Sequence, residues 1–278
     1  MSIELITHDP LEERPAGVWD YISPSRLNTW LKCPLAFKLR YIDGIRTPST
    51  PALFVGKMVH AGLEVYYRHR QLSLAVDTAE LTSRLGPLWE QLAADEGVVF
   101  ESVADEQAAM KQTSDLLAVY LAQVPVDEPR PLAVEASVEA PLVDPVTGED
   151  LGIPLLGIMD LVLPAVEGPV IADFKTSSRS GEPLEIFHEV QLSSYSYLFR
   201  RSSPEPESAL EIRTLVKTKT PKAEVHCYPA RSDAHFRRLF MVIRAYLDDL
   251  DTGRFVFRPG LGCGMCDFRE SQCRAWQG

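Results

Sequence analysis

One apolar hairpin, which carries two aspartates and a lysine, constrains the fold of this chain more than any other feature. Asp160 lies in one apolar segment, and Asp173 and Lys175 lie in the next. The residues between the segments, 164–169, include two prolines and a glycine, which are typical of a turn. The midpoint between the two aspartates falls inside this turn. A symmetric hairpin therefore places Asp160 opposite Asp173, roughly 5 Å apart at Cβ.

The two opposed aspartates predict a bound cation. Like charges that face each other on a sheet destabilise it unless something compensates them. A divalent cation is the natural compensation, because carboxylate oxygens are its preferred ligands. A cation held by two acids beside a lysine has the components for hydrolysing phosphodiester bonds. The alternative is two solvated acids on an amphipathic hairpin, but it explains poorly why both acids interrupt apolar runs.

The composition is typical of a globular protein inside the cell. Hydrophobic residues make up 45% of the 278 residues, which is enough for a packed core. No apolar run is long enough to cross a bilayer, and residues 1–5 lack the basic and apolar parts of a signal peptide. We therefore expect a cytoplasmic protein with no membrane partner. The pattern Gly-x-x-x-x-Gly-Lys-Ser/Thr is absent, so the chain does not supply its own nucleotide-driven motor.

The charge is spread unevenly along the chain. The net charge of −11 does not indicate nucleic-acid binding by itself. Residues 211–278, however, contain 12 Lys and Arg against 8 Asp and Glu, whereas the remainder contains 16 against 31. Basic side chains in this part can follow a phosphate backbone locally, and the alternative is a solvated helix face. They include Lys217, Lys219, Lys222, Arg237, Arg238 and Arg244.

The apolar periodicity predicts helices first and then a small mixed sheet. Ser23 caps a first helix with Pro24 at its first position, Pro34 opens a second through Ile42, and residues 1–20 form an irregular lead-in. Further helices are expected at 52–70, at 72–123 with breaks near Gly86-Pro87 and Gly97, at 185–201 and at 231–250. Strands are expected at 131–143, 151–163, 169–176, 209–218 and 223–228. This order indicates an α/β fold with a crossover helix between the third and fourth strands.

The cysteines predict a metal-binding site. Cys263 and Cys266 form a Cys-x-x-Cys pair among glycines, and Cys273 follows. Cys33 is the best candidate for a fourth ligand, because Cys227 lies in a predicted strand. Four thiolates suit either zinc or an iron–sulfur cluster, and this chemistry leaves the choice open. A ligand at Cys33 would connect the N-terminal helix to the C-terminus across most of the chain, and metal–thiolate bonding offsets the entropy of closing that loop.

Six motifs, in order along residues 21–273, resemble those of RecB/AddB-type nuclease domains. The motifs are YISPSRL at 21–27 with Cys33-Pro34, GKMVH at 56–60, GIMD at 157–160, DFKT at 173–176, QLSSY at 191–195 and the three C-terminal cysteines. The chain thus resembles a stand-alone member of the PD-(D/E)XK superfamily, similar to the iron–sulfur exonucleases associated with CRISPR systems and to phage relatives. The resemblance implies a restriction-endonuclease-like core, in which a small mixed sheet is flanked by helices.

The resemblance also implies roles for individual residues. His60, Asp160 and Asp173 would bind Mg²⁺ or Mn²⁺, while Lys175 would position the attacking water and stabilise charge on the phosphate. Gln191 and Tyr195 would orient the lysine or the DNA strand. A 4Fe–4S cluster would be held by Cys33, Cys263, Cys266 and Cys273.

Some of these assignments have structural alternatives. His60 could be a core histidine, and Gln191 and Tyr195 could be ordinary residues of an amphipathic helix. Glu135 or Glu139 adds a carboxylate, and the sequence leaves this choice open. Asp173 stands where many relatives have glutamate. Both residues offer hard oxygen ligands, so the chemistry should survive.

The implied function is a metal-dependent deoxyribonuclease that works as an exonuclease on single-stranded DNA or DNA ends. It would act in DNA repair, recombination, phage DNA metabolism or CRISPR adaptation. Expected partners besides DNA are further copies of the chain, by analogy with ring-shaped relatives, and a helicase or CRISPR protein. The alternatives are a catalytically weak DNA-binding or adaptor protein and a nuclease with zinc at its cysteines. We expect one nuclease domain over 1–278, with a mainly helical part (21–130), a mixed-sheet catalytic core (131–230) and a helix with the cysteine cluster (231–278).

Overall fold

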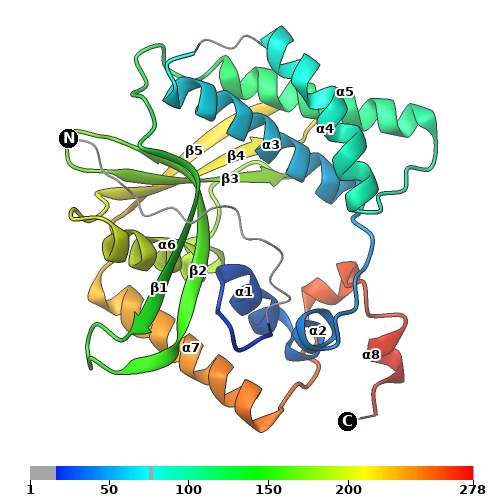
Figure 1. The fold of residues 1–278 in the computed structure, drawn as a ribbon. Helices are drawn as coiled ribbons and strands as arrows, with labels where there is room; N and C mark the ends of the chain where they lie inside the picture. The colour runs from blue at the N-terminus through cyan, green and yellow to red at the C-terminus, as the bar shows by residue number, and fades with distance from the viewer. Residues whose placement is uncertain (1–16, 75–77, 278) are drawn as a thin grey trace.

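The computed structural model describes residues 17–74 and 78–277, in which five strands form one sheet between two layers of helices (Figure 1). The strands follow one another in the sheet in chain order. They are β1 (Ala133–Val143), β2 (Asp150–Leu163), β3 (Val170–Ser177), β4 (Ala209–Val216) and β5 (Lys222–Pro229). Only β3 and β4 run parallel, joined through helix α6 (Glu189–Ser202), and the other neighbours are antiparallel. The predicted mixed sheet with a crossover helix is therefore confirmed.

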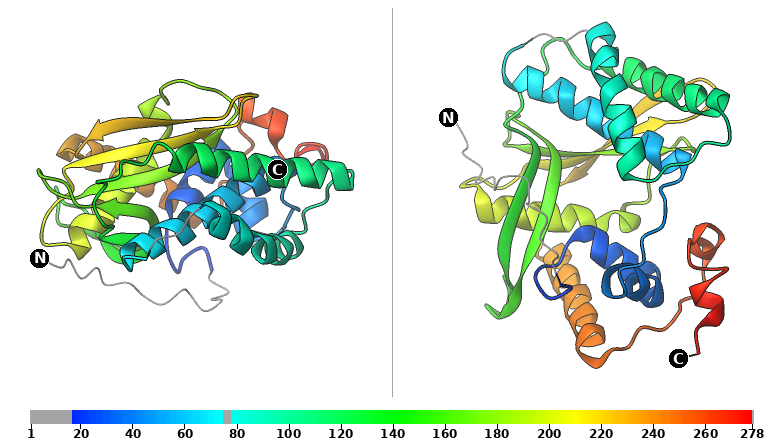
Figure 2. Two further views of the ribbon diagram at one scale, coloured as in Figure 1. Left: turned by 90° about the horizontal axis from the view of Figure 1, so that it is seen from above. Right: turned by 45° about the vertical axis from the view of Figure 1, so that its right-hand side comes forward.

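Helices cover both faces of this sheet (Figures 1 and 2). The upper layer in Figure 1 contains α3 (Pro51–Gln71), α4 (Thr78–Asp95) and α5 (Val103–Leu121). The lower layer contains α1 (Pro24–Lys32), α6 and α7 (Asp233–Thr252). Shorter pieces are α2 (Pro34–Phe37), a π-helical turn (Lys38–Ile42), the 3₁₀ turns Glu185–Phe187 and Leu261–Met265, and α8 (Gln272–Ala275). In residues 17–74 and 78–277, no helix has the length and apolar character that crossing a bilayer requires.

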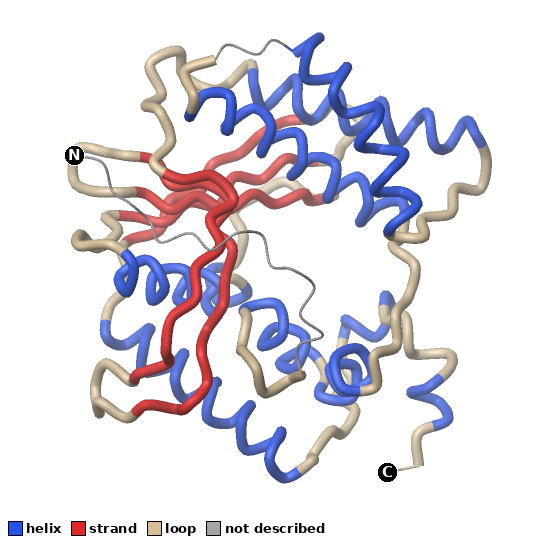
Figure 3. The backbone as a smooth tube through the Cα atoms, in the orientation of Figure 1, coloured by secondary structure: helices blue, strands red, loops and turns tan. Residues whose placement is uncertain are grey.

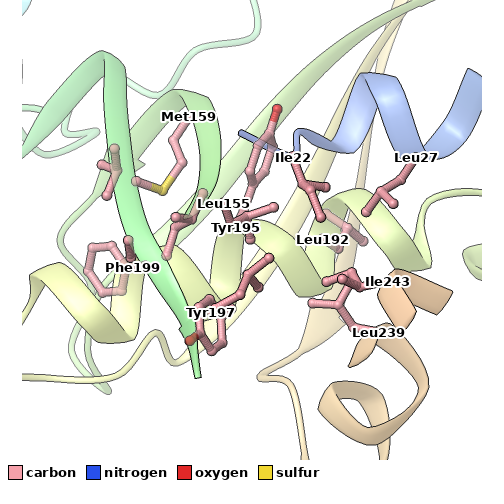
Figure 4. Packing of buried hydrophobic residues seen from close by; sticks show 14 of the residues in the cluster. Ile22, Leu27, Leu155, Met159, Leu192, Tyr195, Tyr197, Phe199, Leu239 and Ile243 are labelled. Carbon is pink, nitrogen blue, oxygen red and sulfur yellow. The ribbon is translucent and has the colours of Figure 1, made fainter. Parts of the chain in front are cut away.

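Two hydrophobic clusters lie on opposite faces of the sheet. In the lower cluster, α1, α6 and α7 pack against β1 and β2 through side chains such as Leu27, Leu192 and Ile243 (Figure 4). In the upper cluster, α3, α4 and α5 pack against Leu161 and Phe174. Since apolar burial stabilises by roughly 25 cal/mol per Å², these clusters hold the helical layers on the sheet.

Several helix boundaries follow from local chemistry. Ser23 accepts a hydrogen bond from the backbone N–H of Arg26 at 3.3 Å, which confirms the predicted cap of α1. The predicted break near Gly97 is also present, between α4 and α5. The predicted break at Gly86-Pro87 is wrong, because α4 continues through Pro87. Leu85 and Trp89 on either side are buried in the upper cluster, and this packing outweighs the lost backbone hydrogen bond.

Parts of the predicted lead-in and of the predicted 72–123 helical stretch lie outside the described residues. Residues 1–16, including the region considered for a signal peptide, and residues 75–77 belong to these parts. The described lead-in does have a structural role at Ile22. Its backbone bonds to Pro154 and Leu156 of β2, both at 2.8 Å, where β2 has no partner from β3. This contact positions α1 beside the sheet.

The two long strands β1 and β2 bend half-way along (Figure 3). Near the start of β1, Glu135 adopts φ = 44°, a left-handed conformation that a residue with a side chain rarely takes in a strand. The pairing is kept on both sides, with Val134 opposite Leu161 and Ala136 opposite Met159. Such strained positions concentrate at functional sites. The strained backbone at Glu135 therefore indicates a functional site in this part of the sheet.

Helix α3 approaches β3 closely at Gly56. A Cβ atom added to this glycine would lie 2.9 Å from Oγ1 of Thr176, which is too close without a rearrangement. The absence of a side chain at position 56 thus lets the helix lie against the end of β3. His60, one turn further along α3, is carried to the same edge of the sheet.

Candidate active site

The two aspartates of the hairpin face each other next to the end of the β2–β3 ladder. The paired residues Leu161–Ala172 and Val162–Ile171 set the register, and one further step places Asp160 opposite Asp173. This is the pairing that the hairpin pattern predicts. Oδ2 of Asp160 accepts a hydrogen bond of 2.7 Å from the backbone N–H of Phe174. That bond joins the two strands where their regular pairing stops.

Glu135 and His60 add ligand groups from two further elements. In the β1–β2 register, Glu135 falls opposite Asp160, so Glu135, Asp160 and Asp173 lie in one row across three strands. One ligand atom each of His60, Glu135 and Asp160 lie within 4.8 Å of one another. Glu139 pairs instead with Leu156, away from this row. Of the two glutamates between which the sequence could not choose, Glu135 is therefore the one that lies beside His60 and Asp160.

Asp173 is held by side chains from its own strand and from α6. The Gln191 amide donates 2.8 Å hydrogen bonds to Asp173 Oδ1 and to the Tyr195 hydroxyl. Lys175 Nζ lies 2.6 Å from Asp173 Oδ2 as an ion pair. Nevertheless, this buried oxygen accepts no well-directed hydrogen bond from any described residue. The exception is informative, since buried polar atoms are nearly always satisfied.

The surroundings of the site stabilise the ionised forms of its acids poorly. Burial, together with the charges of Asp173 and Glu135, raises the pKa of Asp160 well above its usual range, against the opposing effects of Lys175 and the Phe174 N–H. Burial, with Glu64 adding to it, raises the pKa of Glu135 to about 7. Such shifts indicate a place where added positive charge is favourable.

His60 adds an imidazole nitrogen to this group of carboxylates, and its pKa favours the neutral form. Burial and the nearby Lys175 charge lower the pKa of His60, although the charge of Asp173 opposes them. Its Nδ1 lies 3.6 Å from Asp160 Oδ2. A neutral imidazole has a free lone pair, and with the carboxylates of Glu135 and Asp160 it makes a nitrogen and oxygen donor set suited to Mg²⁺ or Mn²⁺. Asp173 lies outside this close group and contacts Lys175 and Gln191.

Protons should compete with the cation at Glu135. A bound divalent ion requires the ionised carboxylate, whose pKa is about 7 in the free protein. We expect the affinity for Mn²⁺ to fall by up to about tenfold per pH unit below pH 7 and to level off above it. Calorimetric titrations at several pH values measure this slope. Glu135→Gln should bind Mn²⁺ more weakly, and its affinity should change less with pH, whereas Glu139→Gln should match the wild type. The same pH dependence in the wild type and both variants would contradict a role for Glu135 in binding the ion.

Four of the five cysteines gather at the other end of the molecule. Cys33 lies between α1 and α2, Cys263 and Cys266 lie in or beside the turn Leu261–Met265, and Cys273 lies in α8, which is beside α2 in Figure 1. Burial raises the pKa of the Cys273 thiol, and the other three sulfurs add to the effect. The backbone N–H of Arg258 also donates to Cys33 Sγ at 3.4 Å. Cys227 lies apart in β5, beside Glu211.

The spacing of these sulfurs bears on what they could bind. Among the described residues, no three cysteine sulfurs lie within 4.8 Å of one another. A single tetrahedral zinc has bonds of about 2.3 Å to each sulfur and would need the sulfurs closer than that.

Ion pairs account for several of the basic residues near the C-terminus. On α7, Arg238 pairs with Glu189, and Arg244 pairs with Asp144 and Glu149. This part of α7 is therefore a paired helix face and not a free phosphate-binding surface. The loop after β4 differs, since Lys219 is exposed there and Lys217 donates to the carbonyl of Ala52 at 3.0 Å. Positive charge remains available at this edge of the sheet.

Comparison with known proteins decides the family. The model of the PD-(D/E)XK nuclease superfamily matches residues 21–274. The chain belongs to the PD-(D/E)XK nuclease superfamily. No curated protein sequence matches it significantly.

One solved structure shares the fold of this chain. A protein from Eubacterium rectale named "Putative exonuclease" superposes with a TM-score of 0.60 over 93% of this chain and 89% of that chain, at 14% identity. At this identity the likeness establishes the fold alone. A second solved protein, SSO0001, covers 80% of this chain and 96% of that chain at 18% identity, and its TM-score of 0.37 carries no argument. Superfamily membership confirms the broad resemblance, while the RecB/AddB type stays a prediction.

His188 is a residue near the site that no motif indicated. It lies between the 3₁₀ turn Glu185–Phe187 and α6, three residues before Gln191. Burial lowers the pKa of His188, and the charges of Lys175 and Asp173 both reach it, with opposite effects. The connection that leads into α6 therefore passes close to the acids.

Proposed function

We propose that this chain is a metal-dependent deoxyribonuclease of the RecB/AddB type that digests DNA from an end, in repair or a related DNA-processing pathway. The observation that carries the proposal is the convergence of His60, Glu135, Asp160 and Asp173 beside Lys175. We treat the described chain as one nuclease domain, because both hydrophobic clusters pack on the same sheet.

The residues present fit a divalent cation. The buried Asp173 Oδ2 lacks a hydrogen bond, and the neighbouring acids have raised pKa values. His60, Glu135, Asp160 and Asp173 would hold Mg²⁺ or Mn²⁺. When bound, the cation supplies positive charge that activates the attacking water and stabilises the leaving oxygen.

The remaining side chains would position the reactants. The ammonium of Lys175, on the same strand as Asp173, can hold the attacking water and neutralise charge that builds on the phosphate. Gln191 keeps Asp173 oriented through Oδ1, so that Oδ2 stays directed toward Lys175. The Tyr195 hydroxyl accepts from the same amide and fixes its rotation. Gln191 and Tyr195 are thus positioning residues in this proposal.

We further propose that Cys33, Cys263, Cys266 and Cys273 hold a 4Fe–4S cluster with a structural role. Support comes from the gathering of the four sulfurs and from the apolar packing of Leu35, Leu39 and Phe268 beside them. The cluster would connect the segment around Cys33 to the C-terminal segment.

A digestion series tests the proposed activity. We expect Mn²⁺-dependent release of nucleotides from labelled linear single-stranded DNA, with a circular strand of the same sequence cut at least about tenfold more slowly. Lys175→Met should lose most of the linear activity, because it removes one charge-stabilising donor, an effect of about 10²- to 10³-fold. Lys111→Met, on the exposed surface of α5, is the matched control.

Other outcomes of the same series are distinguishable. Tight DNA binding without Mn²⁺-dependent cleavage would contradict the proposal in favour of an adaptor protein. Equal rates on linear and circular strands would retain the nuclease but contradict digestion from an end.

A further inference from the structure

The connection between β3 and α6 presents an apolar surface to solvent. Leu184, Ile186 and Phe187 are 65%, 67% and 73% exposed. The 3₁₀ turn that carries them is well formed, because the Phe187 N–H donates to the Leu184 carbonyl at 3.0 Å and the His188 N–H donates to the Glu185 carbonyl at 2.9 Å. Three large apolar side chains within four residues are thus held outward on an ordered turn, an arrangement typical of an interaction surface.

This apolar surface, residues Leu184, Ile186 and Phe187, is continuous with the candidate active site. His188 directly follows Phe187, and the charges of Lys175 and Asp173 shift its pKa in opposite directions. Gln191, one turn into α6, donates to Asp173. A strand whose phosphate lies against Lys175 would therefore bring its neighbouring nucleotides to this surface.

Two of the three acidic residues beside the surface are paired with basic side chains, whereas Glu182 is exposed and forms no ion pair with a described residue. Glu185 forms an ion pair with Arg231 and lies 3.9 Å from His235, while Glu189 pairs with Arg238. On the other side, the exposed Arg179 belongs to the loop that follows β3, and Lys222 ties that loop down by donating to Ser180 at 2.7 Å. Although the whole chain has a net charge of −11, this surface does not repel a polyanion as strongly as that figure implies.

We propose that Leu184, Ile186 and Phe187 bind the unpaired bases next to the scissile phosphate, with Phe187 stacking on one base. The inference rests on the proposed function and names its substrate class as single-stranded DNA. Single strands combine a charged backbone with apolar base faces, and proteins bind them with basic grooves and aromatic platforms. The bases of a duplex stack on each other and cannot use the surface. The continuity with the phosphate-cleaving residues favours this occupant over a second protein.

The substitution Phe187→Ala tests the surface directly. We expect KM for a labelled single-stranded oligonucleotide to rise about tenfold, within the range of one lost base–aromatic stack, while kcat stays within about twofold. Hydrolysis of bis-p-nitrophenyl phosphate, which has no bases, should be unchanged. Phe187→Trp should retain wild-type KM, and Met241→Ala, which removes an equally exposed apolar side chain on α7, should change neither substrate.

Several results would overturn the inference. These are an unchanged KM for Phe187→Ala, an equal loss on the small ester, or a change of oligomeric state, which would assign the surface to another copy of the chain. A wild type that hydrolyses neither substrate would instead refute the proposed function. Fluorescence anisotropy with labelled oligo-dT, without metal, still tests the surface in that case, with an expected affinity loss of about tenfold for Phe187→Ala and an unchanged affinity as the contrary result.

Discussion

Replacing Asp173 by asparagine should lower Mn²⁺-dependent DNA hydrolysis by about 10³-fold or more. Asparagine has nearly the same shape and its Oδ1 can still accept from Gln191. It replaces the unsatisfied Oδ2 by an amide NH₂, which cannot bind a cation and points donors at Lys175. Losing one preorganised electrostatic group in an active site costs 10²- to 10³-fold, and losing a metal ligand as well should cost more. The release of labelled nucleotides from linear single-stranded DNA measures the effect.

A surface aspartate provides the matched control for this variant. Asp115 forms a 2.6 Å ion pair with Lys111 on the exposed face of α5, so it reproduces the aspartate–lysine contact without the buried site. Asp115→Asn should retain wild-type activity. Thermal melting without metal separates chemistry from folding. Asp173→Asn relieves the repulsion of Asp160 but removes the ion pair with Lys175, so the two effects oppose each other and the variant should still melt cooperatively above the assay temperature. Wild-type cutting by Asp173→Asn would remove Asp173 from the proposed mechanism.

Replacing Cys33 by alanine should abolish the iron–sulfur chromophore and destabilise the protein. Purified wild type should be brown, with broad absorbance near about 400 nm. Without its fourth ligand, the proposed cluster would no longer join the segment around Cys33 to the C-terminal segment. We expect the free energy of unfolding to fall by about 3 kcal/mol or more. For a chain of this size that corresponds to a melting temperature lower by roughly 6–12 °C.

Cys227 supplies the control for the cysteine site. It lies in β5, and its thiol contacts Glu211 and none of the other cysteines. Cys227→Ala should remain brown and melt like the wild type. An unchanged spectrum and melting curve for Cys33→Ala would show that the fourth ligand lies elsewhere. Colourless wild-type protein that contains zinc after anaerobic purification would instead refute the cluster.

Much of the fold could be predicted because local patterns repeat with a known period. The apolar run expected at 209–218 became β4 (Ala209–Val216), which is buried along most of its length, and Ser23 began α1 with the expected cap. The register of the hairpin followed from the position of its turn, since side chains alternate along strands and the two aspartates lie at equal distances from the midpoint.

What the sequence could not predict depends on contacts between distant segments. Glu135 and Glu139 are four residues apart and share a face of an ideal strand, so alternation cannot separate them. The positive φ at Glu135 and the bend of β1 direct only Glu135 toward His60. His188 lies near Lys175 because of how the loop returns to α6, which no local pattern records. The helix through Pro87 likewise depends on packing around Trp89.

The buried acids of the candidate site favour the binding of a cation even in the metal-free protein. Burial raises the pKa values of Asp160 and Glu135, so protons compete with the proposed ion for these carboxylates. Each such buried acid costs stability, which proteins accept at functional sites. A purely structural hairpin would gain stability by replacing either acid with an apolar residue.

The most direct test of the account is a Mn²⁺ titration of the wild type and Asp173→Asn, followed by electron paramagnetic resonance at pH 7.5, on samples also assayed for DNA cleavage. We expect the wild type to bind Mn²⁺ and cut DNA, and Asp173→Asn to bind at least about tenfold more weakly and not to cut. Equal Mn²⁺ affinity in both proteins, or wild-type cutting by a variant that no longer binds the ion, would contradict it.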